Sequence, residues 1–187
     1  MRKMKKVLIL NGSLRKKSNS TQLGNSLVMP QEYELEINRY NAYNMNVKPC
    51  TGCGWCDKNV GCVFDDMDGF FADFEAADYF VITTPVYNGG VPAPLKAVVD
   101  RFQRYYALRF AHGVKPPVAK PKRAALVITA GSKGEGREYI EKMFRQQFTV
   151  MNTMLVTTVF VDSTDTKQVG EEEYRLAFEH GKRLFEY

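Results

Sequence analysis

Residues 7–21 read VLILNGSLRKKSNST, an apolar run that passes directly into a turn rich in hydroxyl and amide side chains. A short aliphatic run such as Val7–Leu10 predicts a strand that is buried on both faces. The stretch Thr21–Val28, which ends before Pro30, predicts the helix that follows. A strand, a turn and a helix in this order predict the first part of a βαβ unit.

The same alternation continues along the chain. The predicted strands are Val7–Leu10, Tyr33–Arg39, Tyr79–Thr84, Ala124–Thr129 and Leu155–Val161. The predicted helices are Thr21–Val28, Met67–Ala76, Pro94–Tyr106, Arg137–Met151 and Glu172–Glu186. We expect Asp65 or Asp66 to cap the helix that begins at Met67. This pattern indicates an α/β fold with a doubly wound, five-stranded parallel sheet and helices on both faces.

Length and composition predict one domain over residues 1–187. The chain has 187 residues, of which 44% are hydrophobic and 25% are charged. No apolar run approaches the length of a bilayer span, so we expect no membrane insertion. The apolar run behind the basic residues 1–6 is shorter than the core of a signal peptide, so we expect a cytoplasmic protein. The net charge of +5 comes from dispersed basic residues without a nucleic-acid-binding signature, which favours small anionic ligands over nucleic acid.

Ligands of doubly wound sheets bind beyond the carboxyl ends of the strands, which directs attention to the turn after Leu10. A helix N-terminus offers unpaired N–H groups and positive partial charge to an anion. Hydroxyl and amide donors surround it here: Ser13, Ser18, Asn19, Ser20 and Thr21. The turn lacks the GxxxxGK[ST] and GxGxxG patterns, so the monophosphate of FMN fits best. A plain helix cap with flanking serines is the alternative interpretation.

Two further loops follow predicted strands at the same edge. Residues 85–96 read PVYNGGVPAPLK, in which Gly89 and Gly90 permit a close backbone approach to a planar ring. Tyr87 can stack on such a ring, and the N–H groups of Asn88 and Gly89 can bond its polar rim. The third loop begins at Thr129, and its candidate cofactor-binding residues are Thr129 and Gly131. An irregular strand-to-helix loop would explain the glycines and prolines but not the tyrosine.

All four cysteines lie close together, with the spacing C-x2-C-x2-C-x5-C. They are Cys50, Cys53, Cys56 and Cys62. Thiolates two residues apart can wrap one cuboidal iron-sulfur cluster, and Gly52 and Gly54 permit the tight turn. Zinc is a weaker interpretation, since its structural sites usually draw ligands from two separated pairs. The thiols can also stay reduced beside a cofactor, or pair as a disulfide in air.

These motifs resemble the NADPH-dependent FMN reductases of flavodoxin-like fold, and within them the iron-sulfur flavoproteins. The resemblance rests on NGSLRKKSNST, CTGCGWCDKNVGCVFDDM and ITTPVYNGGVPAPLKAVVDRF. It implies the strand order 2-1-3-4-5. It implies that the FMN phosphate is held by Ser13, Arg15, Ser18, Asn19, Ser20 and Thr21. It implies that the isoalloxazine is held by Pro85, Val86, Tyr87, Asn88, Gly89 and Gly90. It also implies a homodimer or homotetramer and, at the cysteines, a [4Fe-4S] cluster, although Val63 stands where the bacterial ferredoxin run has proline.

The sequence therefore predicts an FMN-dependent oxidoreductase without catalytic side chains, since the cofactor carries the chemistry. NAD(P)H or a redox protein would be the donor, and a quinone, a flavin, dioxygen or another small molecule the acceptor. The alternatives are an FMN-binding electron-transfer protein without turnover and a zinc-stabilised binding module. A receiver-like domain would need an acidic pocket where residues 11–13 read NGS. We expect surface positions for His112 and His180, and for Trp55 either a cover over a cofactor or a packing role.

Overall fold

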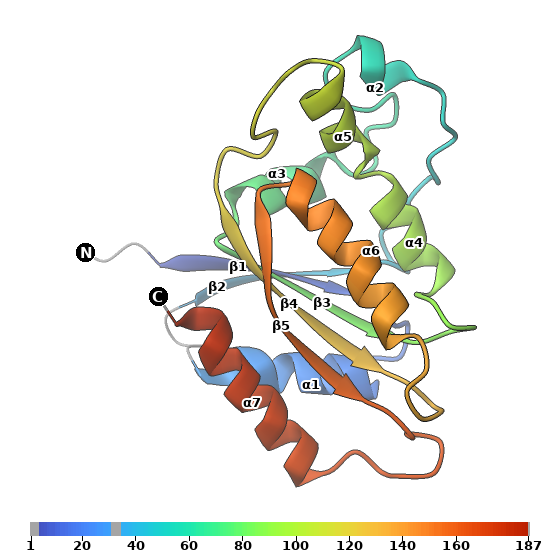
Figure 1. Cartoon of the computed structure of the whole chain (residues 1–187), viewed down its shortest axis with the longest axis vertical. Helices are drawn as coiled ribbons and strands as arrows, with labels where there is room; N and C mark the ends of the chain where they lie inside the picture. Colours follow the sequence, from blue (N-terminus) through green and yellow to red (C-terminus); the bar gives the residue numbers. More distant parts are fainter. Residues whose placement is uncertain (1–3, 31–34, 187) are drawn as a thin grey trace.

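The computed structural model of the chain describes residues 4–30 and 35–186, so residues 33 and 34 of the predicted second strand lie outside it. The strands are β1 Lys5–Asn11, β2 Leu35–Asn41, β3 Tyr79–Pro85, β4 Lys122–Thr129 and β5 Thr153–Val161. The helices are α1 Asn19–Val28, α2 Trp55–Lys58, α3 Asp68–Ala76, α4 Ala93–Asp100, α5 Gln103–Phe110, α6 Arg137–Val150 and α7 Glu171–Phe185. All strand pairs of the sheet are parallel, and the order β2-β1-β3-β4-β5 confirms the predicted topology (Figure 1).

Helices cover both faces of the sheet, and each face has its own apolar core. Val7 of β1 packs on the side of α1 and α7, together with Leu27. Leu8, the next residue, points to the opposite side and packs with Phe74 of α3. This alternation follows from the period of two in a strand, which requires a strand between two helix layers to be apolar on both faces.

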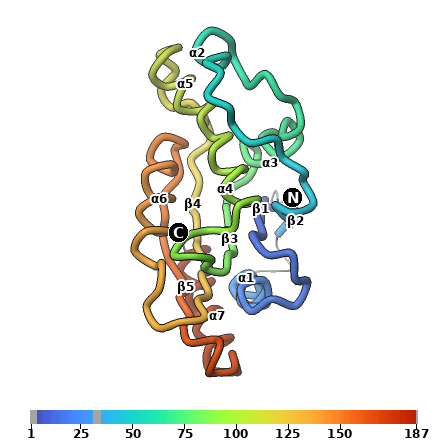
Figure 2. The backbone as a smooth tube through the Cα atoms, turned by 90° about the vertical axis from the view of Figure 1, so that its right-hand side faces the viewer, coloured from blue at the N-terminus to red at the C-terminus, as the bar shows by residue number. Residues whose placement is uncertain are grey.

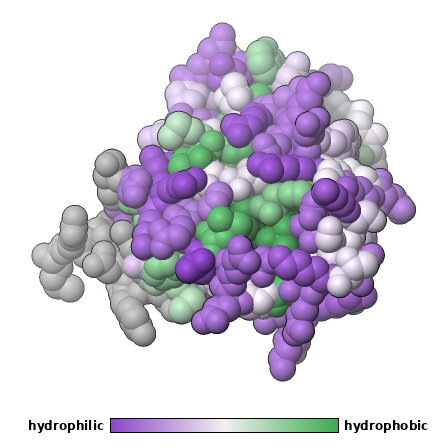
Figure 3. Space-filling view, turned by 60° about the horizontal axis from the view of Figure 1, so that its bottom comes forward, coloured by the Kyte–Doolittle hydropathy of each residue, from purple (hydrophilic) through white to green (hydrophobic). Residues whose placement is uncertain are grey.

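The α2 and α5 helices lie at one end of the molecule, away from α1 and α7 (Figure 2). The α7 helix buries Ala177 and Leu184 against the sheet. The surface seen from the opposite end is mostly hydrophilic, with an apolar area near its centre (Figure 3). None of the described helices is both long and apolar enough to cross a bilayer.

The register of the sheet brings the carboxyl ends of neighbouring strands to one edge. Asn11, the last residue of β1, pairs with Asn41 of β2 and Thr83 of β3. Thr129, the last residue of β4, pairs with Pro85 of β3 and with the end of β5. The loops that follow β1, β3, β4 and β5 therefore meet at this edge.

The prediction of one helix over Pro94–Tyr106 is wrong, because α4 ends at Asp100 and α5 begins at Gln103. At the break, the Arg101 and Phe102 N–H groups donate to carbonyls only three residues back. The Arg101 side chain, which is 1% exposed, is held by backbone carbonyls of another segment. We attribute the break to these tertiary bonds, which helical periodicity alone does not reveal.

The predicted cap of α3 is also wrong. Met67 occupies the N-cap position, and no side chain bonds the first turn. The Asp66 carboxylate instead accepts the Lys48 N–H at 2.7 Å and forms an ion pair with Arg101. A buried arginine offers this carboxylate a stronger partner than the helix end does.

Candidate functional site

A pocket of about 510 Å³ lies where the loops meet at the carboxyl edge. It is lined by Ser13, Arg15, Lys17, Ser18, Asn19, Pro85, Val86, Tyr87, Asn88, Thr129, Gly131, Ser132, Glu135, Thr164 and Asp165. The structure thus brings together residues from all three loops singled out in the sequence.

The first wall of this pocket is the start of α1. Ser18 caps the helix, and its Oγ accepts the Thr21 N–H at 3.2 Å. The same hydroxyl donates to Thr21 Oγ1 at 2.8 Å and lies 3.3 Å from Ser20 Oγ. Helix geometry leaves the N–H groups of Asn19 and Ser20 without partners inside the helix. The positive end of the helix dipole and these donors lie at the same end of the pocket.

The turn between β1 and α1 is held by bonds across the edge of the sheet. Ser13 is buried, its carbonyl accepts from Asn41 Nδ2 at 2.7 Å, and its Oγ accepts the Arg15 N–H at 3.3 Å. The buried Asn11 Oδ1 accepts from Thr83 Oγ1 at 2.9 Å. These bonds fix the turn without any ligand. The exposed side chains of Arg15 and Lys17 add positive charge.

A tight hairpin forms the second wall. Tyr87 and Gly90 exchange two backbone bonds of 2.9 and 3.0 Å, and Asn88 and Gly89 between them have φ values of 50° and 75°. Positive φ at both central residues is the type I′ turn, which favours Asn-Gly. Tyr87 at the base of this turn is 46% exposed at the pocket. The Gly89 N–H donates to Glu135 Oε1 at 3.2 Å, so this group, expected to bond a ring, already has an acceptor.

The loops after β4 and β5 form the third wall. The Asp165 carboxylate lies so close to Gly131 that a Cβ at that glycine would collide with it. Thr164 binds the Ala130 carbonyl through its N–H and its hydroxyl, both at 3.1 Å. The loop after β5 is thereby tied to the loop after β4.

Some predicted residues do not line this pocket. Ser20 is fully buried, and Thr21 is the next residue of α1. Both contact the Ser18 hydroxyl. Gly89 and Gly90 line an adjoining pocket, which shares Tyr87 and Asn88 with the first. Lining residues that the sequence reasoning missed are Lys17, Ser132, Glu135, Thr164 and Asp165. The rule that loops gather at carboxyl ends applies equally to β5 and would have indicated the last two.

The chemistry of this pocket fits FMN. One end carries hydroxyl donors, a helix N-terminus and two cationic side chains, which suit a phosphate. The other end carries an exposed tyrosine on a tight turn, next to backbone-rich loops, which suits a planar ring.

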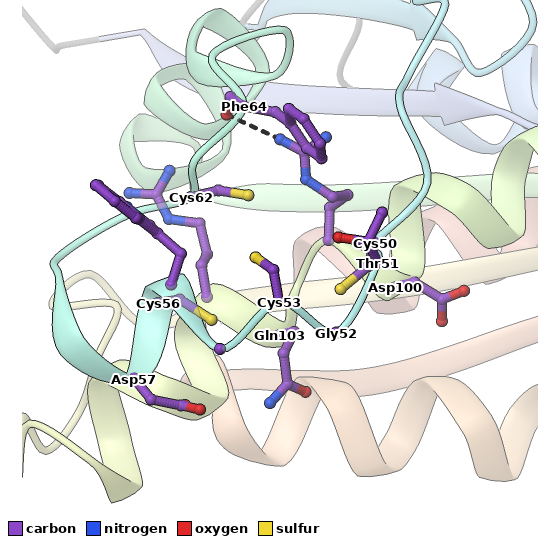
Figure 4. A pocket seen from close by; sticks show the side chains of 14 residues that line it. Cys50, Thr51, Gly52, Cys53, Cys56, Asp57, Cys62, Phe64, Asp100 and Gln103 are labelled. Carbon is purple, nitrogen blue, oxygen red and sulfur yellow. Dashed lines mark hydrogen bonds between the residues drawn. The ribbon is translucent and has the colours of Figure 1, made fainter.

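A second pocket, of about 380 Å³, contains all four cysteines (Figure 4). Its lining is Cys50, Thr51, Gly52, Cys53, Gly54, Trp55, Cys56, Asp57, Cys62, Phe64, Asp100, Arg101, Gln103 and Arg104. The four sulfur atoms lie around the same space in Figure 4. All four thiols are free.

Two glycines shape the cysteine segment as the sequence predicts. Gly52 and Gly54 have φ values of 65° and 69°, the left-handed region that favours glycine. Gly54 precedes the short helix α2, which includes Cys56 and was not expected from the sequence. The Trp55 side chain is 45% exposed and lines the pocket.

The thiols differ in exposure. Cys50 and Cys53 are exposed, whereas Cys56 and Cys62 are half-buried. Burial, aided by the nearby Asp57 carboxylate, raises the pKa of the Cys56 thiol. Within the described residues, no three His, Cys, Asp or Glu side chains gather as the ligands of one metal ion.

Both histidines are partly exposed, and each makes a tertiary contact in addition to the surface position expected from the sequence. His112 Nε2 lies 2.9 Å from the Cys56 carbonyl oxygen, so the loop after α5 binds the cysteine segment. His180 Nδ1 bonds the Thr157 hydroxyl between α7 and β5. Burial, with nearby Arg183 and Arg137, lowers the pKa of His180. Both contacts join segments distant in sequence, which local spacing cannot show.

The two pockets lie at opposite ends of α4. The loop that contains the Tyr87 hairpin leads into Ala93, the first residue of α4. Asp100, the last residue of α4, lines the cysteine pocket. A helix of this length spans about 12 Å. The lining sets of the two pockets have no residue in common.

The parallel sheet, its strand order and a ligand-sized pocket at the carboxyl edge define a flavodoxin-like protein. Solved structures share this fold. An NAD(P)H:quinone oxidoreductase from Methanothermobacter marburgensis superposes with a TM-score of 0.68 at 16% identity, covering 97% of this chain and 96% of its own. A flavone reductase gives a TM-score of 0.71 at 17% identity over 96% of this chain and 61% of its own.

The family model described as NADPH-dependent FMN reductase matches residues 5–167. The chain belongs to this family of NAD(P)H-dependent oxidoreductases. An iron-sulfur flavoprotein from Methanosarcina thermophila is 34% identical over 135 residues, which are 71% of this chain and 67% of that protein. FMN-dependent NADH:quinone oxidoreductase 1 from Colwellia psychrerythraea is 31% identical over 130 residues, or 67% of this chain and 64% of its own.

Proposed function

We propose that the protein binds FMN in the carboxyl-edge pocket and transfers electrons from NAD(P)H, or from a redox protein, to a small-molecule acceptor of the quinone type. One observation carries the proposal: the N-terminus of α1 and the Tyr87 hairpin form walls of the same pocket. A phosphate and a planar ring can therefore be held together. The family match and the quinone oxidoreductase among the relatives support the donor and the acceptor.

In this proposal the residues at the start of α1 hold the phosphate. The Ser13 hydroxyl, the Asn19 amide and the helix N–H groups would donate to its oxygens, and the Ser18 O–H would do so by turning away from Thr21 Oγ1. Arg15, which lines the same pocket, would neutralise charge. Pro85, Val86 and Tyr87 pack against the ring, and Thr129 and Gly131 contact it from the loop after β4. Ser20 and Thr21 act through the Ser18 hydroxyl, which they orient.

Bound FMN would supply hydride and single-electron chemistry, so the protein needs to bind, orient and shield the ring. The Glu135 carboxylate holds the Gly89 N–H and thereby the tip of the hairpin. Asp165, placed against Gly131, sets how closely the loops after β4 and β5 approach each other.

We further propose that Cys50, Cys53, Cys56 and Cys62 bind one [4Fe-4S] cluster, which would relay single electrons between the flavin and a partner. An all-cysteine donor set around one space supports this, as does the naming of several relatives as iron-sulfur flavoproteins. The reducing cytoplasm is the compartment that suits four free thiols. We also propose that the protein assembles as a homodimer or homotetramer.

Absorption spectra of protein purified without oxygen test both cofactors, because flavin and iron-sulfur bands differ. Titration with FMN, FAD and riboflavin should give the tightest binding for FMN; equal affinity for FAD and FMN would contradict a socket for a single terminal phosphate. Iron and acid-labile sulfide should be present, and should fall in Cys53→Ser while the FMN content stays unchanged. Zinc without iron would instead support a structural metal site.

Steady-state oxidation of NADPH and NADH with a soluble quinone separates an enzyme from an electron carrier. Turnover that depends on bound FMN supports the oxidoreductase. Reduction by a chemical donor without nicotinamide oxidation would support the alternative, an FMN-binding electron-transfer protein.

A further inference from the structure

Charged side chains line the cysteine pocket beside the thiols. They are the arginines Arg101 and Arg104 and the carboxylates Asp57 and Asp100. The Arg101 side chain is 1% exposed and that of Arg104 is 15% exposed. Two guanidinium groups that are themselves little exposed to water therefore line the same pocket as the thiols.

Each of these arginines has a donor that nothing in the described residues accepts. Arg101 directs Nη1 to the Lys48 carbonyl at 2.9 Å and Nη2 to the Phe64 carbonyl at 3.0 Å, but its Nε–H is buried without a partner. The Nε–H of Arg104 is likewise buried and unpaired. A buried donor without an acceptor is costly, and native structures rarely retain one without a reason.

The break between α4 and α5 presents both arginines to the pocket. Residues 101 and 104 are three apart, the spacing that places side chains on one side of a helical turn. The Arg104 guanidinium stacks 4.3 Å from the centroid of the Phe71 ring, which fixes its position on the core. Its carboxylate neighbours Asp68 and Glu75 are 4.0 and 3.9 Å away. Asp68 is largely exposed and Glu75 is half-exposed, so water screens their charge. Arg101 has a closer counter-charge, because its Nη1 lies 2.8 Å from the Asp66 carboxylate, which is 17% exposed. Arg104 is therefore the less compensated of the two arginines.

We propose that Arg101 and Arg104 raise the reduction potential of the group that the cysteines hold, an inference that rests on the proposed [4Fe-4S] cluster. A cluster bound by four thiolates is anionic and becomes more so when reduced. Fixed positive charge beside it stabilises the reduced form, and hydrogen bonds to its sulfurs act in the same direction. One electron enters, from the flavin or an external donor. No bond to either arginine forms or breaks, and both guanidiniums stay protonated.

Arg104 is the better position for the test, because Arg101 also holds the cysteine segment by its backbone. Arg104→Gln removes the charge, whereas Arg104→Lys keeps it and removes the Nε–H. Arg109→Gln is the matched control: it lies on the same helix, removes the same charge and does not line the pocket. The midpoint potential of the cluster is measured by redox titration followed by electron paramagnetic resonance, with iron and sulfide determined on each sample.

We expect Arg104→Gln to shift the potential to more negative values by a tenfold change in the one-electron equilibrium, which is about 59 mV. Arg104→Lys should shift it less, and Arg109→Gln should leave it unchanged.

If wild type contains the cluster, and Arg104→Gln has the same midpoint potential and iron content as wild type, this inference is overturned. The cluster proposal then stays intact. The absence of iron and sulfide from wild type handled without oxygen overturns the cluster and this inference together, while FMN binding is unaffected.

Discussion

Arg101 Nη1 lies 2.8 Å from Asp66 Oδ1, an ion pair that joins the break between α4 and α5 to the segment before α3. The same guanidinium binds the carbonyls of Lys48 and Phe64, which flank the cysteine segment on both sides. The phenyl ring of Phe64 stacks 5.3 Å from it. Both ends of the cysteine segment are therefore anchored by one side chain, independently of any bound group.

Asp66→Ala should destabilise the protein by about 2 to 3 kcal/mol. It leaves the buried Arg101 guanidinium without its counter-charge and the Lys48 N–H without its acceptor. The estimate stands below that for a fully buried pair because Asp66 is 17% exposed. Urea unfolding followed by circular dichroism measures the difference. Asp65→Ala, at an exposed neighbour, should change the free energy of unfolding by less than about 0.5 kcal/mol.

The same carboxylate should make stability depend on acid pH. Burial acts to raise the pKa of Asp66, but the Lys48 N–H and the Arg101 charge outweigh it and hold the pKa below its usual 3.8. A carboxyl whose pKa is lower in the folded than in the unfolded state contributes stability above the unfolded pKa and loses it as the pH falls through the folded one. Wild type should therefore lose stability below about pH 4 more steeply than Asp66→Asn. Parallel curves for the two proteins between pH 5 and pH 2.5 would refute this assignment.

Replacement of Ser18 and Ser20 by alanine should weaken FMN binding by about tenfold to a hundredfold, the range for hydrogen bonds to a charged group. Riboflavin binding should change little, since riboflavin has no phosphate. Flavin fluorescence titrations give both affinities. The Ser18 substitution also removes the cap of α1, at about 1 kcal/mol of stability, so Ser26→Ala in the same helix serves as a control. Equal losses for both ligands would place the phosphate elsewhere.

Two glycines should respond to alanine in opposite directions. A Cβ at Gly181 of α7 would collide with the Leu27 carbonyl oxygen of α1, so Gly181→Ala should cost about 2 to 3 kcal/mol by forcing the helices apart. At Gly69 in α3 the nearest atom to an added Cβ is the Tyr40 hydroxyl at 4.0 Å. Gly69→Ala should stabilise the protein by about 0.5 to 1 kcal/mol through helix propensity. Thermal unfolding of both variants tests the contrast, and a loss of stability at Gly69 would disprove it.

The sequence by itself determined the fold class and the edge of the sheet where the loops meet. Both depend on local pattern: aliphatic runs such as Val7–Leu10 predict buried strands, and the carboxyl ends of parallel strands share one edge. The strand order was implied by the resemblance of the motifs to a family. The Asn88-Gly89 pair and the cysteine spacing are likewise local features. Asn88 and Gly89 in the hairpin, and Gly52 and Gly54 between the cysteines, have the positive φ values that Asn and Gly tolerate.

Only the tertiary structure decided where helices break and which charges meet. Arg101 ends α4 early because its guanidinium bonds carbonyls 53 and 37 residues away in sequence. Asp66 forms an ion pair with that arginine instead of capping α3. His112, which follows α5, bonds the Cys56 carbonyl in the cysteine segment. Such choices depend on partners that folding alone brings together, because local spacing carries no information about side chains that meet from distant parts of the chain.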